Sequence, residues 1–124
     1  MYNYQHDDKQ IPWSSIKDKI TTVEIEEKVT SIGNNIFVNC TAIKSFDLPQ
    51  SLTSIGDCSF ESCISLQSIS FSENINSIGY NPFVNCTALE SIEIHENNNY
   101  FIFDDKCLFD EDTTRLRYDF KLKN

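Results

Sequence analysis

The chain has 124 residues, which is room for one domain, and its 10 basic and 19 acidic residues give a formal net charge of -9. This charge argues against a nucleic-acid partner and against docking on anionic lipid, because both need a basic protein face. No apolar run approaches the roughly 18 to 20 residues of a membrane span. Residues 1–8 show neither the basic nor the apolar region of a secretory signal. We therefore expect no nucleic-acid ligand and no membrane insertion.

Residues 1–19 are expected to form an N-terminal tail and cap. Ile11, Trp13 and Ile16 are apolar and stand just before a regular pattern begins. We expect them to cover the open end of the first coil of a repeat array, because terminal units of such arrays are atypical and shield the core.

The repeat array is expected at residues 20–97, as a half unit followed by three full units. The half unit covers residues 20–28, and the full units cover residues 29–51, 52–74 and 75–97. Glycine, isoleucine, phenylalanine and cysteine each recur at a spacing of 23 residues: Gly33, Gly56, Gly79; Ile32, Ile55, Ile78; Phe37, Phe60, Phe83; Cys40, Cys63, Cys86. A fixed period of this length predicts a solenoid, in which stacking buries apolar faces that no single coil buries alone.

Three short elements are predicted within each unit. The pattern apolar-x-x-apolar-x-apolar begins at Ile20, Ile43, Leu66 and Leu89, and its closing alternation predicts a short strand. A second extended segment is predicted before each glycine, where the glycine permits either a positive φ or a close backbone approach. Between the glycine and the cysteine, the apolar spacing predicts a short 3₁₀ or α turn.

Residues 98–124 are predicted to cap the last coil as a hairpin, because residues 106–109 and 115–118 are rich in apolar residues and flank the polar run 110–114. Several acids cluster near this turn without the spacing of a dedicated calcium loop, and we interpret them as a solvated turn. They are Asp104, Asp105, Asp110, Glu111 and Asp112.

The unit LxxIxLPxxLTSIGxxxFxxC resembles the BspA-like leucine-rich repeat, a family of bacterial surface proteins and of surface antigens in parasitic protists. The resemblance covers residues 20–97, and it departs from the pattern where Ser72 and His95 replace the proline of the strand exit. It implies a right-handed leucine-rich-repeat solenoid with parallel strands on its concave side. It also implies adhesion to a protein or extracellular-matrix ligand, at the cell surface or outside the cell.

The strand positions between the buried ones are expected to point outward and to form hydroxyl-rich and acidic ladders, with rungs about 4.8 Å apart. The candidate binding residues are Thr22, Glu24, Lys44, Ser45, Asp47, Gln67, Ser68, Ser70, Glu90, Ser91 and Glu93. One interpretation is a docking strip for a basic protein segment or for divalent cations. The other is a solvated strand face in an acidic protein.

The cysteines and histidines predict no catalytic or metal site. Cysteines 23 residues apart do not match the spacing of zinc ligands, so Cys40, Cys63 and Cys86 are predicted to fill small buried spaces, although adjacent coils are close enough for a strained disulfide. His6 and His95 have no partner that the spacing would identify as a catalytic group. We therefore expect no enzyme activity and no cofactor.

Two N-x-T sequons, at Asn39 and Asn85, arise from the repeated segment FVNCT, so the repeat explains them first and a glycan would require a secretory route. The predicted function is a non-catalytic binding or adhesion module that resembles BspA-like surface proteins. The alternative is an intracellular scaffold or adaptor that uses the same repeat face, because several unpaired cysteines suit a reducing compartment such as the cytoplasm. The sequence does not specify the ligand or the oligomeric state.

Overall fold

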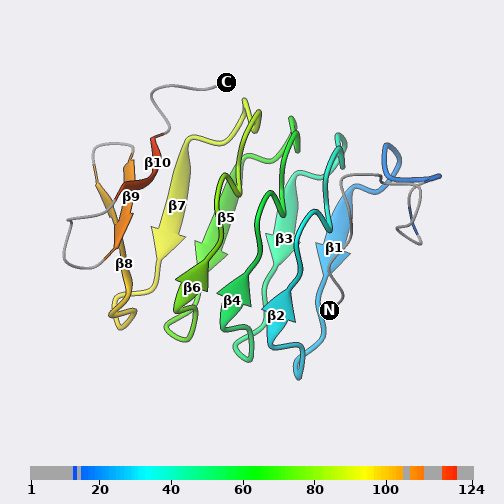
Figure 1. Cartoon of the computed structure of the whole chain (residues 1–124). Helices are drawn as coiled ribbons and strands as arrows, with labels where there is room; N and C mark the ends of the chain where they lie inside the picture. Colours follow the sequence, from blue (N-terminus) through cyan, green and yellow to red (C-terminus); the bar gives the residue numbers. More distant parts are fainter. Residues whose placement is uncertain (1–12, 14, 105–106, 111–115, 120–124) are drawn as a thin grey trace.

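Seven short strands line two sides of a stack of coils in the computed structural model, which describes residues 13, 15–104, 107–110 and 116–119 (Figure 1). One side carries β1 (Thr22–Glu24), β3 (Ser45–Asp47), β5 (Ser68–Phe71) and β7 (Ser91–Ile94). The other side carries β2 (Ser31–Ile32), β4 (Ser54–Ile55) and β6 (Ser77–Ile78). The predicted solenoid of short strands is confirmed.

Strand pairing follows the 23-residue period. β2, β4 and β6 form one parallel sheet, with Ile32 opposite Ile55 and Ile55 opposite Ile78. β1 pairs with β3 and β5 pairs with β7, both in parallel and in the register that the repeat predicts. Equivalent residues of successive coils therefore lie beside one another.

Pairing is interrupted between β3 and β5, where one backbone hydrogen bond joins the segments just before the strands, from Gln67 N to Lys44 O at 3.3 Å. Phe46 lies at this interruption. The equivalent residue in the other three strands is the smaller valine or isoleucine. The Phe46 ring packs inside the coils, 4.9 Å from the Phe37 ring and 4.8 Å from the Phe60 ring. This larger side chain is the feature that distinguishes β3 from its neighbours.

The segment from each glycine to the following cysteine contains no helix, so the predicted 3₁₀ or α turn is wrong. A left-handed residue at every fourth position prevents a helix, because a right-handed helix needs negative φ throughout. Six such residues have φ angles between 50° and 62°: Asn35, Asn39, Cys58, Ser62, Asn81 and Asn85. Most of them are asparagine, which adopts this conformation more readily than other residues with a Cβ atom.

The amides of these turns donate hydrogen bonds to the next coil. The first coil donates three, each 2.9 Å long: Asn35 N to Asp57 O, Phe37 N to Ser59 O, and Asn39 N to Glu61 O. The second coil donates three more, of 2.7 to 3.0 Å: Cys58 N to Tyr80 O, Phe60 N to Pro82 O, and Ser62 N to Val84 O. Backbone groups of one coil are therefore satisfied by its neighbour and not by a helix of their own.

Gly56 and Gly79 allow a close approach between coils, and none of the three repeated glycines has a positive φ. A Cβ atom on Gly56 would lie 2.5 Å from Asn34 Oδ1 and 2.7 Å from Asn34 N, closer than real Cβ contacts. Asn34 Oδ1 itself accepts a hydrogen bond of 2.7 Å from Asp57 N, and Asp57 Oδ1 accepts one of 2.8 Å from Tyr80 N. Of the two roles predicted for these glycines, the close approach is confirmed and the positive φ is wrong.

A row of stacked aromatic rings runs through the core. Phe37, Phe60 and Phe83 occupy the same position in successive units, with ring centroids 5.8 and 5.5 Å apart and nearly parallel planes. Trp13 extends the row over the N-terminal end, 5.8 Å from Phe37, as expected of a cap. Ile16 is 50% exposed and does not cover the core, contrary to our prediction, and Ile11 lies outside the described residues.

At the other end an antiparallel sheet contains β8 (Phe101–Asp104), β9 (Cys107–Asp110) and β10 (Leu116–Asp119), in the order β10-β9-β8. The predicted hairpin is present as β9 and β10. β8 was not predicted, because polar residues precede Phe101. Phe101 nevertheless falls 23 residues after Ile78 and is equally buried. Asp105, Glu111 and Asp112 of the acidic turn lie outside the described residues.

We expect the Gly56→Ala variant to be less stable than the wild type by roughly 1 to 3 kcal/mol, because the added methyl group forces the two coils apart. In open space the same change would instead stabilise the protein by about 0.4 to 1 kcal/mol, through loss of unfolded-state entropy. Urea denaturation measures the difference, and Ser77→Ala, at an exposed position of β6, is the control. A Gly56→Ala variant at least as stable as the wild type would contradict the close-approach account.

Candidate functional site

The outward residues of β1, β3, β5 and β7, together with the residue before each strand, form a continuous surface that we call the strand face. All eleven predicted binding residues, from Thr22 to Glu93, are exposed. The residues between them point into the core, and Phe46, Ile69 and Ile92 are 7%, 2% and 3% exposed. The structure thus places the predicted residues on one surface, and their binding of a ligand stays a prediction.

Two ladders cross the strand face in the expected order. Hydroxyl groups stand opposite each other, Thr22 beside Ser45 in one strand pair and Ser68 beside Ser91 in the other. In the second ladder Glu24 stands beside Asp47. Neighbouring parallel strands are about 4.8 Å apart, so these two carboxylates repel each other unless a cation or a basic group lies between them.

The C-terminal half of the acidic ladder is arranged differently. Ser70 stands opposite Glu93, and its Oγ donates a hydrogen bond of 3.2 Å to Glu93 Oε2. This hydrogen bond orients the Glu93 carboxylate. Glu93 therefore faces a serine, and not a second carboxylate, in this strand pair. Of the twelve residues on the strand face, which are the eleven predicted ones and Thr21, four are acids and Lys44 is the only base.

A groove of about 320 Å³ opens on the strand face beside the interrupted pairing of β3 and β5. Its polar lining includes Ser70, Glu93 and His95, and its apolar lining includes Leu48 and Ile94. A carboxylate beside apolar surface suits a lysine or arginine side chain, whose aliphatic stem packs while its charged end is paired. Sequence reasoning missed the apolar part of this groove, because Leu48 and Ile94 were counted as core.

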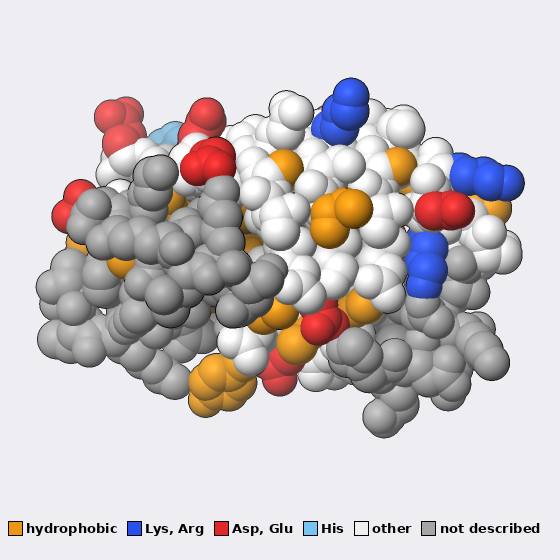
Figure 2. Space-filling view, turned by 90° about the horizontal axis from the view of Figure 1, so that it is seen from above, with side chains coloured by type: hydrophobic (Ala, Val, Ile, Leu, Met, Phe, Trp, Pro, Cys, Tyr) orange, Lys and Arg blue, Asp and Glu red, His pale blue; other side chains and the backbone are white. Residues whose placement is uncertain are grey.

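Charge is unevenly distributed over the described surface. Figure 2 shows lysine side chains towards the N-terminal end, with an acidic side chain among them, and a group of acidic side chains towards the C-terminal end. The lysines of the described part of the chain all lie between residues 17 and 44. On the strand face itself, Glu90 and Glu93 favour the approach of a basic group to β7.

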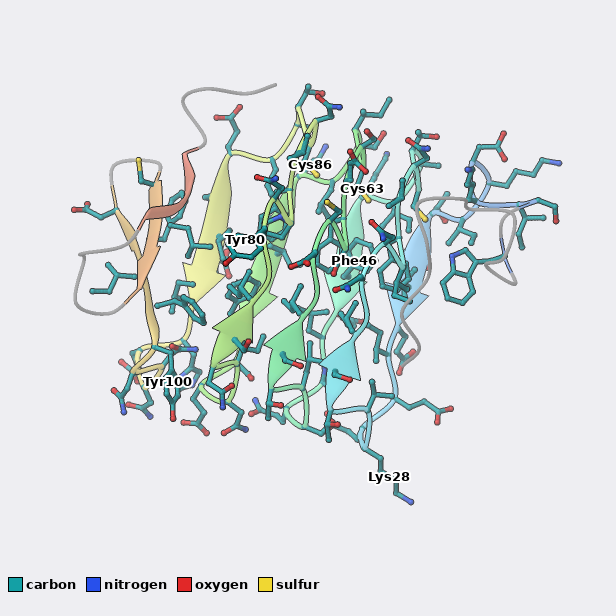
Figure 3. The ribbon with its side chains drawn as sticks, viewed as in Figure 1. Lys28, Phe46, Cys63, Tyr80, Cys86 and Tyr100 are labelled. Carbon is teal, nitrogen blue, oxygen red and sulfur yellow. The ribbon has the colours of Figure 1, made fainter. Side chains whose placement is uncertain are left out.

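The repeated cysteines form a buried ladder of thiols (Figure 3). Cys63 Sγ donates to Phe37 O at 3.2 Å, and Cys86 Sγ donates to Phe60 O at 2.9 Å, each one coil back. All five cysteines are free, and Cys40 is also buried. The predicted structural role is confirmed, and the thiol has a second task as a hydrogen-bond donor between coils.

The surroundings of the thiols hold them in the protonated form. Burial raises the pKa of Cys40 to about 11, against a smaller opposing effect of the Lys17 charge. A hydrogen bond with the Cys86 thiol, followed by burial, raises the pKa of Cys63. Burial and then the nearby carboxylates Glu61 and Asp57 raise the pKa of Cys58. A nucleophilic cysteine needs a lowered pKa, so none of these three thiols is suited to catalysis.

The remaining candidate residues are the two histidines and the two sequon asparagines. His95 lies at a strand exit, as predicted, and its Nδ1 accepts a hydrogen bond of 3.0 Å from Asn97 N. His6 lies outside the described residues. Both sequon asparagines, Asn39 and Asn85, are exposed, and whether they carry glycans stays a prediction.

The described part of the chain contains neither a metal-binding cluster nor a membrane-spanning helix. No group of three or more histidine, cysteine or acidic residues is arranged there to hold a metal ion. No helix there has the length and apolar character that crossing a bilayer requires.

A model of the BspA-type leucine-rich repeat region matches residues 14–117 of the chain in six copies. Among curated proteins, no sequence matches. The chain is similar to the crystal structure of a leucine-rich cell surface protein from Faecalibacterium prausnitzii A2-165. The TM-score is 0.68 and the identity 29%, over 75% of this chain and 24% of that one.

Two further solved structures show the same fold. The pneumococcal vaccine antigen PcpA matches with a TM-score of 0.74 and 24% identity, over 86% of this chain and 27% of that one. A leucine-rich repeat protein from Eubacterium ventriosum ATCC 27560 matches with a TM-score of 0.53 and 19% identity, over 90% and 41%. The chain spans less than half of the length of each of these relatives.

Proposed function

Because the chain belongs to the BspA-type leucine-rich repeat family, we propose that it is a non-catalytic binding module that adheres to a protein or extracellular-matrix ligand through its strand face. The observation that carries this proposal is the pair of exposed ladders, held in register by parallel pairing between Thr22–Glu24 and Ser45–Asp47 and between Ser68–Phe71 and Ser91–Ile94. A face of aligned polar groups suits recognition of another surface, because paired strands hold its backbone positions before the ligand arrives.

The ligand is a basic protein segment. Glu24 and Asp47 are adjacent carboxylates whose repulsion a lysine or arginine relieves. Further along, Glu93 is oriented by Ser70 at the edge of a groove with apolar walls, which accepts the stem of a second basic side chain. Two anchoring positions on one face fix the orientation in which the segment lies across the strands.

A location at the cell surface is part of the proposal. It is supported by the family and by the relative from Faecalibacterium prausnitzii, which is described as a cell surface protein.

An intracellular scaffold or adaptor that uses the same face is the second candidate. The observation in its favour is the set of five free cysteines, which suits a reducing compartment. Antibody staining of intact and of permeabilised source cells separates the two candidates. We expect staining of intact cells, and staining only after permeabilisation would move the search to intracellular partners.

We expect the double variant Glu24→Ser, Asp47→Ser to bind an immobilised peptide of alternating lysine and serine about tenfold more weakly than the wild type. Two exposed charge pairs, at about 0.2 to 1 kcal/mol each, give a loss of this order. Wild-type binding is also expected to weaken as salt rises from about 0.05 to 0.5 M, because salt screens exposed charges.

The matched control is Asp18→Asn with Asp104→Asn, which removes the same number of exposed acids from outside the strand face. Surface plasmon resonance measures all three proteins. An equal loss in both double variants would show that only net charge matters, and unchanged affinity in the Glu24, Asp47 variant would exclude this part of the face.

A further inference from the structure

A second groove, of about 490 Å³, lies at the corner of the coils between the two rows of strands. Every side chain that lines it carries a polar group: Gln50, Ser51, Thr53, Glu73, Asn74, Asn76, Asn97, Asn99 and Tyr100. Figure 3 shows Tyr100 at the lower edge of the molecule, among side chains that end in nitrogen and oxygen. The groove shares only Gln50 with the groove of the strand face.

The residues that line the groove recur at the repeat spacing, but the repeat does not require asparagine at these positions. Asn97 and Asn74 occupy the position of Ser51, and Asn99 and Asn76 occupy that of Thr53. Since serine and threonine satisfy the same corner one coil earlier, the fold does not require asparagine there. The amides are therefore a property of the C-terminal coils.

One asparagine beneath the groove has a structural task. Asn98 Nδ2 donates to Ser72 O at 2.8 Å and to Ile75 O at 3.0 Å. Its Oδ1 accepts from Tyr100 N at 2.8 Å and from Phe101 N at 3.1 Å. Asn98 thus fixes the backbone that presents the Tyr100 ring.

The amides of the groove itself are differently engaged. Asn74 Nδ2 donates to Gln50 O at 2.8 Å, which orients this side chain across two coils. For Asn76, Asn97 and Asn99, no side-chain hydrogen bond to another residue of the described segments is present, and all three are exposed. Each of these amides offers two donors and an acceptor to a ligand.

The chemistry of the lining selects a class of ligand. Adjacent donors and acceptors match the paired hydroxyl groups of a sugar, and the face of Tyr100, which is 48% exposed, offers an apolar surface to the C–H groups of a pyranose ring. Among the described residues, no lysine, arginine or histidine lines the groove and Glu73 is the single charged one, so this lining disfavours sulfated and phosphorylated ligands. A peptide would need apolar pockets for its side chains, which this lining lacks.

We propose that this groove binds a neutral oligosaccharide. Asn76, Asn97 and Asn99 hydrogen-bond its hydroxyl groups, and Tyr100 stacks against one of its rings. The site shares only Gln50 with the groove of the strand face and uses none of its acids, so the two proposals stand or fall independently.

The test is a titration of the isotope-labelled chain with four neutral tetrasaccharides, built from glucose in α and in β linkage, from mannose and from N-acetylglucosamine. Two-dimensional NMR follows the side-chain amides of the groove. We expect saturable shifts with at least one of the four below about 10 mM. Tyr100→Ala is expected to weaken that binding by about two- to tenfold, because the sugar ring loses its aromatic stacking partner.

The matched control is Tyr80→Ala, which removes a tyrosine that is 65% exposed and does not line the groove. Thermal unfolding of both variants checks that they fold, and Asn76→Ala with Asn99→Ala provides a second variant that spares Tyr100. Absence of a saturable shift with all four sugars would overturn the proposal. So would equal weakening by Tyr80→Ala, or tighter binding to a sulfated tetrasaccharide or to an unrelated polar peptide tested in parallel.

Discussion

The close approach of neighbouring coils is the constraint on which the rest of this structure depends. It is possible because glycine leaves no side chain between Gly56 and Asn34, where a Cβ atom would meet backbone at 2.7 Å. At this separation the Asn34 and Asp57 side chains reach the amides of the next coil, and the Cys63 and Cys86 thiols reach carbonyls of the previous one. The stacked phenylalanine rings, about 5.5 Å apart, follow from the same spacing.

On the turn side of the coils, the free-energy cost of left-handed residues is set against the gain from hydrogen bonds between coils. Each junction contains two left-handed residues, such as Asn35 and Asn39, and three hydrogen bonds to the next coil. A left-handed residue costs roughly 1 to 2 kcal/mol, less when it is asparagine, and each bond contributes about 0.5 to 1.5 kcal/mol net. These contributions nearly cancel, so burial of the aromatic row and of the strand residues decides that the coils stack.

Much of the fold was predictable because equivalent residues contact each other in a solenoid. The 23-residue period alone predicts that Ser45 lies beside Thr22 and Asp47 beside Glu24. The period does not predict where the conformation of one coil differs from that of the others. The strand at Phe101–Asp104 and the interruption beside Phe46 depend on contacts across coils or on a single unmatched residue. The left-handed residues do recur at the period, but cysteine and serine adopt this conformation as well as asparagine, so residue type did not predict them. The strand face was predictable from the alternation of apolar and polar residues. The two grooves depend on where the chain turns at the corners of the coils, and the sequence did not predict those positions.

Native-state hydrogen exchange tests the dependence on inter-coil bonding most directly. The account predicts that the amides of Phe37, Asn39, Phe60 and Ser62 are protected as strongly as those in Ser54–Ile55, although these residues lie in turns. It also predicts that turn and strand amides of neighbouring coils are exposed by the same opening reaction. Exchange of the turn amides at the rate of an unfolded chain, with the strands still protected, would contradict it.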